Sequence, residues 1–137
     1  MPIRVVRLGT PRAPDEGPRL GTVRRPPRGV RKEDYGRRDY FDLWLPDLAP
    51  SAGLVSYAYA QEFTPQRWAS YARRYRREMR APTPQRLLAL LAVLSQQANF
   101  SVGCYCENES RCHRSLLREL LAEAGAEIQG GGRGAEG

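Results

Sequence analysis

Residues 99–125 read NFSVGCYCENESRCHRSLLRELLAEAG, and this stretch decides the fold. Its first part, NFSVGCYC, is a short apolar run of β-prone residues, which is typical of a buried strand in a parallel sheet. The polar ENES follows as a tight loop. RCHRSLLRELLAEAG then has the period of an amphipathic helix that ends at Gly125, with either Asn108 or Ser110 as its cap. The predicted core face of this helix is Leu116, Leu117, Leu120, Leu121 and Ala124.

Two more helices are predicted upstream of this strand. The segment TPQRWASYARRYRREM begins with Thr64 as a cap and Pro65 in the first helical position, and it places aromatic side chains on one face and arginines on the others. The segment TPQRLLALLAVLSQQA repeats the start signal at Thr83 and Pro84. Its predicted core face is Leu87, Leu90, Leu91, Leu94 and Ala98.

The N-terminal part of the chain favours strands and irregular structure. IRVVRL (3–8) and RLGTV (19–23) read as strands, RRPPRG after them is held extended by its prolines, and residues 30–62 are irregular with a short helix or two. AEI (126–128) is a candidate for one last short strand. This order predicts an α/β fold over residues 1–128: a single domain with a small, mostly parallel sheet flanked by helices, Rossmann-like. Residues 129–137 read as a flexible tail.

The 137-residue chain has a formal net charge of +7, and this charge is unevenly distributed. Residues 1–40 hold eleven basic and five acidic side chains, whereas the remainder holds eleven and ten. A basic N-terminal third is compatible with nucleic-acid binding. No stretch has the length and apolar content of a signal peptide or a membrane span, so we expect a cytoplasmic protein without a membrane partner. The odd number of cysteines favours reduced thiols over a disulfide framework.

All three cysteines and the only histidine lie between Cys104 and His113. In an α/β sheet this strand-to-helix loop is where ligands bind, and the first N–H groups of a helix favour an anion. Arg111 and Arg114 would add charge suited to a phosphate or carboxylate. The same positive surroundings would lower the pKa of a nearby thiol and make it nucleophilic.

Several kinds of chemistry are open at this loop. The spacing of a zinc knuckle is absent, the two strand cysteines lie along a rigid ladder, and Cys112 and His113 diverge on their helix, so we expect no metal and no other cofactor. A phosphatase-type loop is excluded because no arginine follows either strand cysteine at the required distance. Thiol chemistry remains, with Cys106 or Cys112 as nucleophile and Glu107 or His113 as acid–base. The alternative is that the cysteines are packing residues, which is the favoured interpretation for Cys104.

CYCENESRCHRSLLRELLAEAGAEI resembles the C-terminal signature of the bacterial family called domain of unknown function 488. The matching positions are Cys106, Glu107, Cys112, His113 and Arg114. The segment VRRPPRG is similar to a motif of the YeaO-like branch of that family through Arg24, Pro27, Arg28 and Gly29, while Val23, Arg25 and Pro26 depart from it. Further matches to that branch are Trp44, Pro50, Ser51, Phe63 and Tyr71. The resemblance implies a compact bacterial α/β domain with no established activity.

These observations predict one polar site, in which Arg24 and Arg28 face the loop from Cys106 to Arg114. We expect it to bind an anionic small molecule or nucleotide that carries phosphate or carboxylate, with thiol-based catalysis as an open question. One alternative is a nucleic-acid-binding accessory protein that uses the basic N-terminal third and the arginine-rich helix. Another is a redox-responsive protein in which Cys106 and Cys112 form a reversible disulfide. The sequence leaves the oligomeric state undetermined.

Overall fold

Four parallel strands form one sheet in the order β1-β4-β2-β3. The computed structural model describes residues 3–60, 62–106 and 108–129. The strands are β1 (Ile3–Arg7), β2 (Arg19–Gly21), β3 (Leu43–Trp44) and β4 (Phe100–Cys104). β4 lies between β1 and β2, and all five of its residues are buried, which confirms the interior parallel strand predicted from NFSVGCYC. The α/β fold class is therefore confirmed.

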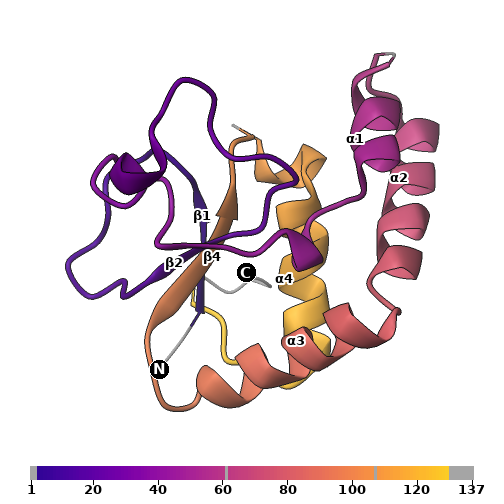
Figure 1. The fold of residues 1–137 in the computed structure, drawn as a ribbon. Coiled ribbons are helices and arrows are strands. Elements are labelled where there is room, and N and C mark those ends of the chain that lie inside the picture. The colour runs from indigo at the N-terminus through magenta and orange to yellow at the C-terminus, as the bar shows by residue number, and fades with distance from the viewer. Residues whose placement is uncertain (1–2, 61, 107, 130–137) are drawn as a thin grey trace.

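The α-helices gather on one side of the strands, and the segment between β2 and β3 lies on the other (Figure 1). The α-helices are α1 (Ala52–Tyr59), α2 (Pro65–Glu78), α3 (Pro82–Leu94) and α4 (His113–Glu123). Three short 3-10 helices are η1 (Lys32–Asp34), η2 (Pro46–Leu48) and η3 (Glu109–Arg111). In the part of the chain that the structure describes, no helix is long and apolar enough to cross a membrane.

Helix starts follow the predicted signals in one case and differ in two. Thr64 caps α2, and its side chain accepts a hydrogen bond from the Arg67 N–H. α3 begins at Pro82, two residues before the predicted start, because a proline fits the first turn, where the backbone N–H has no helical partner. The cap of α4 is Cys112, so the prediction of Asn108 or Ser110 as its cap was wrong. η3 occupies residues 109–111 and delays the start of the α-helix.

The main core lies between the sheet and the helices. Its buried members from the sheet and helices include Ile3, Leu54, Tyr71, Tyr75, Leu88, Leu91, Phe100, Val102, Leu116, Leu117 and Leu121. The predicted face of α3 was only partly right, since Leu90 and Leu94 are 51% and 41% exposed while Leu88 is buried. Leucines surround most of α3, so periodicity alone could not select the buried side, and packing on α4 selects it.

The opposite side of the sheet is held by a buried ion pair. Arg19 and Glu16 are 1% and 2% exposed, and Arg19 Nε donates to Glu16 Oε2 over 2.5 Å. Arg19 Nη1 also donates to the carbonyls of Thr10 and Asp39 over 2.8 and 2.7 Å. Ser101 of β4 donates its hydroxyl to Glu16 Oε2 over 2.7 Å. The pair therefore anchors the irregular segment to the central strand.

The chain end is partly tied to the sheet. Ile128 forms an isolated parallel bridge to Ile3 instead of the short strand predicted over residues 126–128. The Gln129 N–H donates to the Ile3 carbonyl over 2.8 Å. Most of the tail predicted over residues 129–137 lies outside the described residues, of which Gln129 is the last.

Candidate functional site

A cavity of about 900 Å³ opens at the carboxyl ends of β2 and β4. Its walls come from the segment after β2, from α1 and the start of α2, from the loop after β4 and from the start of α4. This is the edge of a parallel sheet at which α/β proteins bind ligands. The volume lies within the range of small-molecule sites in proteins.

The cavity brings together residues from both ends of the sequence. Its lining includes five arginines, namely Arg24, Arg25, Arg28, Arg67 and Arg111, and the thiol and imidazole groups of Cys104, Cys106, Cys112 and His113. Arg24 and Arg28 thus share one cavity with the loop that follows β4. Arg114 does not belong to the lining, and Glu107, predicted as an acid–base residue, lies outside the described residues.

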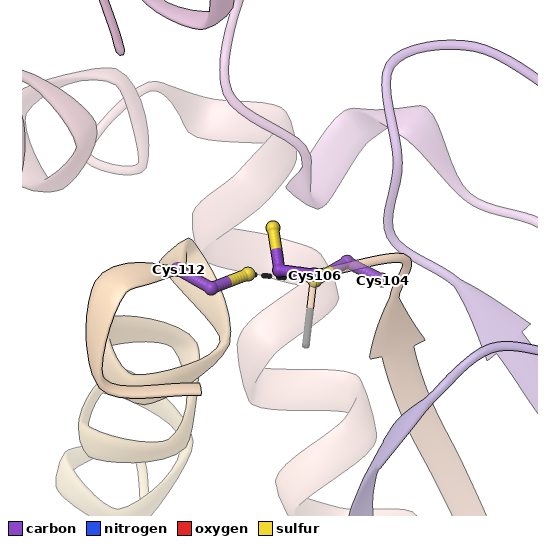
Figure 2. Close-up of side chains that lie close together, drawn as sticks. All are labelled: Cys104, Cys106 and Cys112. Atoms are coloured by element: carbon purple, nitrogen blue, oxygen red, sulfur yellow. Dashed lines mark hydrogen bonds between the residues drawn. The ribbon is translucent and has the colours of Figure 1, made fainter. Parts of the chain in front are cut away.

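The three cysteine sulfurs form a cluster in which all Sγ atoms lie within 4.8 Å of one another. The Sγ atoms of Cys104 and Cys112 are 2.6 Å apart, and both side chains are buried at 2% exposure. Cys106 is half-buried. Figure 2 shows Cys104 at the end of β4, Cys106 in the loop just after it, and Cys112 reaching toward them from the start of α4. All three cysteines line the cavity, and Cys106 is the most exposed of them.

The three thiols differ in acidity because their surroundings differ. Hydrogen bonds from the Cys104 and Cys112 thiols hold the pKa of Cys106 far below its usual value, and these contacts outweigh the effect of burial. Hydrogen bonding to Cys106 and Cys112, together with burial, raises the pKa of Cys104. A hydrogen bond from Cys104 lowers the pKa of Cys112, but hydrogen bonding to Cys106 and burial outweigh it and raise this pKa to about 11. Cys106 is therefore the one thiol of the cluster whose pKa its surroundings lower.

His113 is buried at 5% exposure between β2 and the thiols. Its Nε2 lies 2.6 Å from the Thr22 carbonyl oxygen, which can only accept, so Nε2 carries the proton. Nδ1 is then the lone-pair nitrogen, and it lies 3.7 Å from Cys112 Sγ. Burial lowers the pKa of His113 to about 4, so the ring is neutral near pH 7. His113 Nδ1 thus lies next to Cys112, and the prediction of His113 as an acid–base residue stays untested.

The predicted ligand-binding arginines have different surroundings. Arg24 donates to the carbonyls of Pro46, Ala49 and Pro50 over 2.9 to 3.3 Å, so its guanidinium holds the segment before α1 in place. Arg114 is 4% exposed and donates from Nη2 to the Cys106 carbonyl over 2.6 Å, so this buried guanidinium holds the backbone of the loop that follows β4.

Two other predicted arginines remain on the cavity wall. Arg111 lies 4.3 Å from the centre of the Phe63 ring, a cation–π distance. Arg28 is exposed, and within the described ranges it makes no hydrogen bond or ion pair that would occupy its guanidinium. Arg28, like its neighbour Arg25, is therefore a cavity arginine whose guanidinium can meet a ligand.

Sequence reasoning missed the aromatic part of the cavity. Its lining includes Tyr57, Tyr59, Phe63, Trp68 and Tyr105. The negative charge of the Cys106 thiolate raises the pKa of Tyr59, which is 77% exposed, so the phenol and the thiol interact electrostatically. The sequence predicted a short helix or two within residues 30–62, and α1 is such a helix, but no local signal indicated that its aromatic side chains line the cavity. Cys104 is a buried strand residue that packs in the core, as predicted, and it also belongs to the thiol cluster.

Three converging thiols could also serve as ligands of a thiophilic ion such as Zn²⁺. Cys104 and Cys106 do not lie along one rigid strand as predicted, because β4 ends at Cys104 and Cys106 follows in the loop. Closed structural zinc sites use four ligands, and the group found among the described residues has three.

The basic N-terminal third makes many internal contacts. Arg4 pairs with Asp15, Arg12 pairs with Asp42, and Arg19 is buried on Glu16. On α2, Arg76 pairs with Glu119 and Glu123 of α4. These contacts engage several of the arginines on which the nucleic-acid prediction depends. That prediction stays untested.

Comparison with known proteins agrees with the resemblance seen in the sequence. The chain matches the model of a family described as the active DUF488-N3 subclade over residues 3–125. It is similar to uncharacterized proteins of Mycobacterium bovis and Mycobacterium tuberculosis, with 29% identity over 119 residues that cover 87% of this chain and 92% of each relative. No solved structure matches it significantly. Because the family match spans nearly all of the described part, the chain belongs to the DUF488 family.

Proposed function

We propose that the protein is a cytoplasmic thiol enzyme that binds a small molecule carrying phosphate or carboxylate groups, or a nucleotide, and attacks it with Cys106. The observation that carries this proposal is the placement of the Cys106 thiol in a cavity lined by five arginines, with two buried thiols behind it. The arginines supply the charge that an anion needs, and the aromatic wall supplies apolar contact for the rest of the molecule.

Each group has a role in the proposed reaction. Cys106 is the nucleophile, because hydrogen bonds from two neighbouring thiols stabilise its thiolate. Arg28 and Arg111 bind the anionic group of the substrate at the cavity wall. Arg114 is a positioning residue, since it holds the Cys106 carbonyl. Arg24 is a positioning residue for the segment that leads into α1.

Alkylation of Cys106 by iodoacetamide tests the nucleophile. We expect Cys106 to react in the native protein with an apparent pKa well below the ~8.5 of a free thiol, so that its rate changes little as the pH rises from 6 to 8. Cys104 and Cys112 should react only slowly because they are buried. Peptide mass spectrometry reports each rate, and Cys106→Ser should remove the fast reaction. An apparent pKa at or above the free-thiol value would rule out the proposed thiolate.

The arginine wall is tested by anion protection of the same thiol. We expect alkylation of Cys106 to be slowed by inorganic phosphate, citrate or adenosine monophosphate. For the anion that protects, Arg28→Ala should lower the binding affinity by about tenfold, as expected for the loss of one charged hydrogen bond. Arg73→Ala is the matched control, because Arg73 is an exposed arginine of α2 outside the cavity lining. Equal losses in both variants would indicate a diffuse positive field, as nucleic-acid binding would use, and would contradict a localised anion site.

A further inference from the structure

A chain of contacts behind Cys106 joins Cys104, Cys112 and His113. Cys106 would not need this chain if it acted only as a nucleophile. Cys112 Sγ lies 2.6 Å from Cys104 Sγ and 3.7 Å from His113 Nδ1. All three Sγ atoms lie within 4.8 Å of one another, so Cys112 is close to both other sulfurs. All three residues of this chain are buried, while Cys106 reaches the cavity. The sulfurs thus run from an accessible thiol to a buried pair.

His113 is placed to orient the Cys112 thiol. Its Nε2 proton is held by the Thr22 carbonyl, which leaves the Nδ1 lone pair on the side of Cys112. A neutral imidazole in this orientation accepts a hydrogen bond from the Cys112 thiol and so orients it. The high pKa of Cys112 means that its proton must leave as it attacks, and the departing substrate thiolate is the acceptor.

We propose that the three thiols form a relay that reduces a small anionic disulfide by two electrons, an inference that rests on the proposed function of Cys106. In the first step the Cys106 thiolate attacks one sulfur of the disulfide, the substrate S–S bond breaks, and one thiolate leaves. Cys112 then attacks Cys106 Sγ, so that a Cys106–Cys112 disulfide forms, and its proton passes to the second substrate thiolate as that thiolate leaves. Finally, Cys104 attacks Cys112 Sγ and releases Cys106 as a thiolate.

The atoms and electrons of the relay balance. The substrate disulfide gains two electrons and two protons and leaves as two thiols. The protons come from the Cys104 and Cys112 thiols, which are oxidised to one disulfide, and Cys106 ends as it began. The order of the three thiols favours this direction, because the thiol of lowest pKa is the best leaving group in thiol–disulfide exchange. A dithiol reductant then returns the Cys104–Cys112 disulfide to two thiols.

The cavity favours an anionic disulfide over a smaller oxidant. A space of about 900 Å³ is far larger than hydrogen peroxide requires, and its aromatic wall suits a molecule with apolar parts. Five arginines on the lining favour carboxylate or phosphate groups on that molecule and disfavour a cationic one.

The test uses the full reduced chain, glutathione disulfide as the anionic probe and cystamine as a cationic control. After reaction, free thiols are blocked and the products are mapped by mass spectrometry. Wild-type protein should release two glutathiones per chain and carry a Cys104–Cys112 disulfide with Cys106 free. Cys112→Ser should release one glutathione and keep a mixed disulfide at Cys106. Cys104→Ser should release two and stop at a Cys106–Cys112 disulfide. Cystamine should react at least tenfold more slowly than glutathione disulfide.

The disulfides found in wild-type protein test the relay by themselves, so the result does not depend on whether a variant folds. A stable mixed disulfide at Cys106 in wild-type protein, or two glutathiones released by Cys112→Ser, would overturn the relay while leaving Cys106 as the nucleophile. Faster reaction with hydrogen peroxide than with glutathione disulfide would overturn the substrate class. Thiols that react only after a chelator removes a bound metal would overturn both the relay and the proposed function.

Discussion

Replacing Arg19 by methionine is expected to lower the free energy of unfolding by about 3–5 kcal/mol, because it leaves the Glu16 carboxylate buried without its partner. Arg19 and Glu16 are 1% and 2% exposed, and two hydrogen bonds of 2.5 and 3.2 Å join them. The same substitution also removes the donors to the carbonyls of Thr10, Pro11 and Asp39. Urea denaturation of both proteins at pH 7 measures the difference.

Arg4→Met is the matched control, since Arg4 pairs with the exposed carboxylate of Asp15. A surface pair of this kind contributes about 1 kcal/mol or less, so the control should change the urea midpoint little. Losses of similar size in the two variants would show that the Arg19 pair has no special role in the fold.

The loss of stability in Arg19→Met should also become smaller as the pH falls. Burial acts to raise the pKa of Glu16, but hydrogen bonds from Arg19 and Ser101 outweigh it and lower that pKa in the folded state. A lowered folded-state pKa stabilises the protein above the unfolded value of about 4.3, and this contribution is lost as the pH falls through the folded value. The gap in stability between wild type and Arg19→Met should therefore narrow below about pH 4.

Substitution of Gly103 by alanine is expected to destabilise the protein by about 3 kcal/mol, the upper end of the cost of overpacking. A Cβ on Gly103 would lie 2.6 Å from the Val6 carbonyl oxygen and 2.9 Å from side-chain atoms of Val6 and Leu8. Gly103 is in the central strand and pairs with β1 and β2, so the backbone has little freedom to yield. The shift would reach Cys104 and should also slow the alkylation of Cys106.

Gly53→Ala provides the opposite control. Gly53 lies in α1, and a Cβ there would meet nothing within 4 Å. Alanine should therefore stabilise the protein by about 0.5–1 kcal/mol through its higher helix propensity. Thermal unfolding of both variants measures whether each change in stability is a loss or a gain. A gain in stability for Gly103→Ala would show that the strands can move apart at this position.

The sequence alone determined the elements whose signals are local. Thr64 and Pro65 mark the start of α2, and the run from Phe100 to Cys104 marks the central strand. These signals depend on backbone dihedrals, on orphan N–H groups and on burial of a short apolar run, which neighbouring residues fix by themselves. The family resemblance carried by Cys112, His113 and Arg114 is local for the same reason.

Only the tertiary structure decided the candidate site. The chain turns after Cys104, so Cys106 leaves the strand and meets Cys112, a contact that the strand period argued against. The meeting of Arg28 with the cysteine loop, the aromatic wall from α1 and the bond from His113 to Thr22 join segments far apart in the sequence. Such contacts depend on how helices pack on the sheet, and no pattern in a single segment encodes that packing.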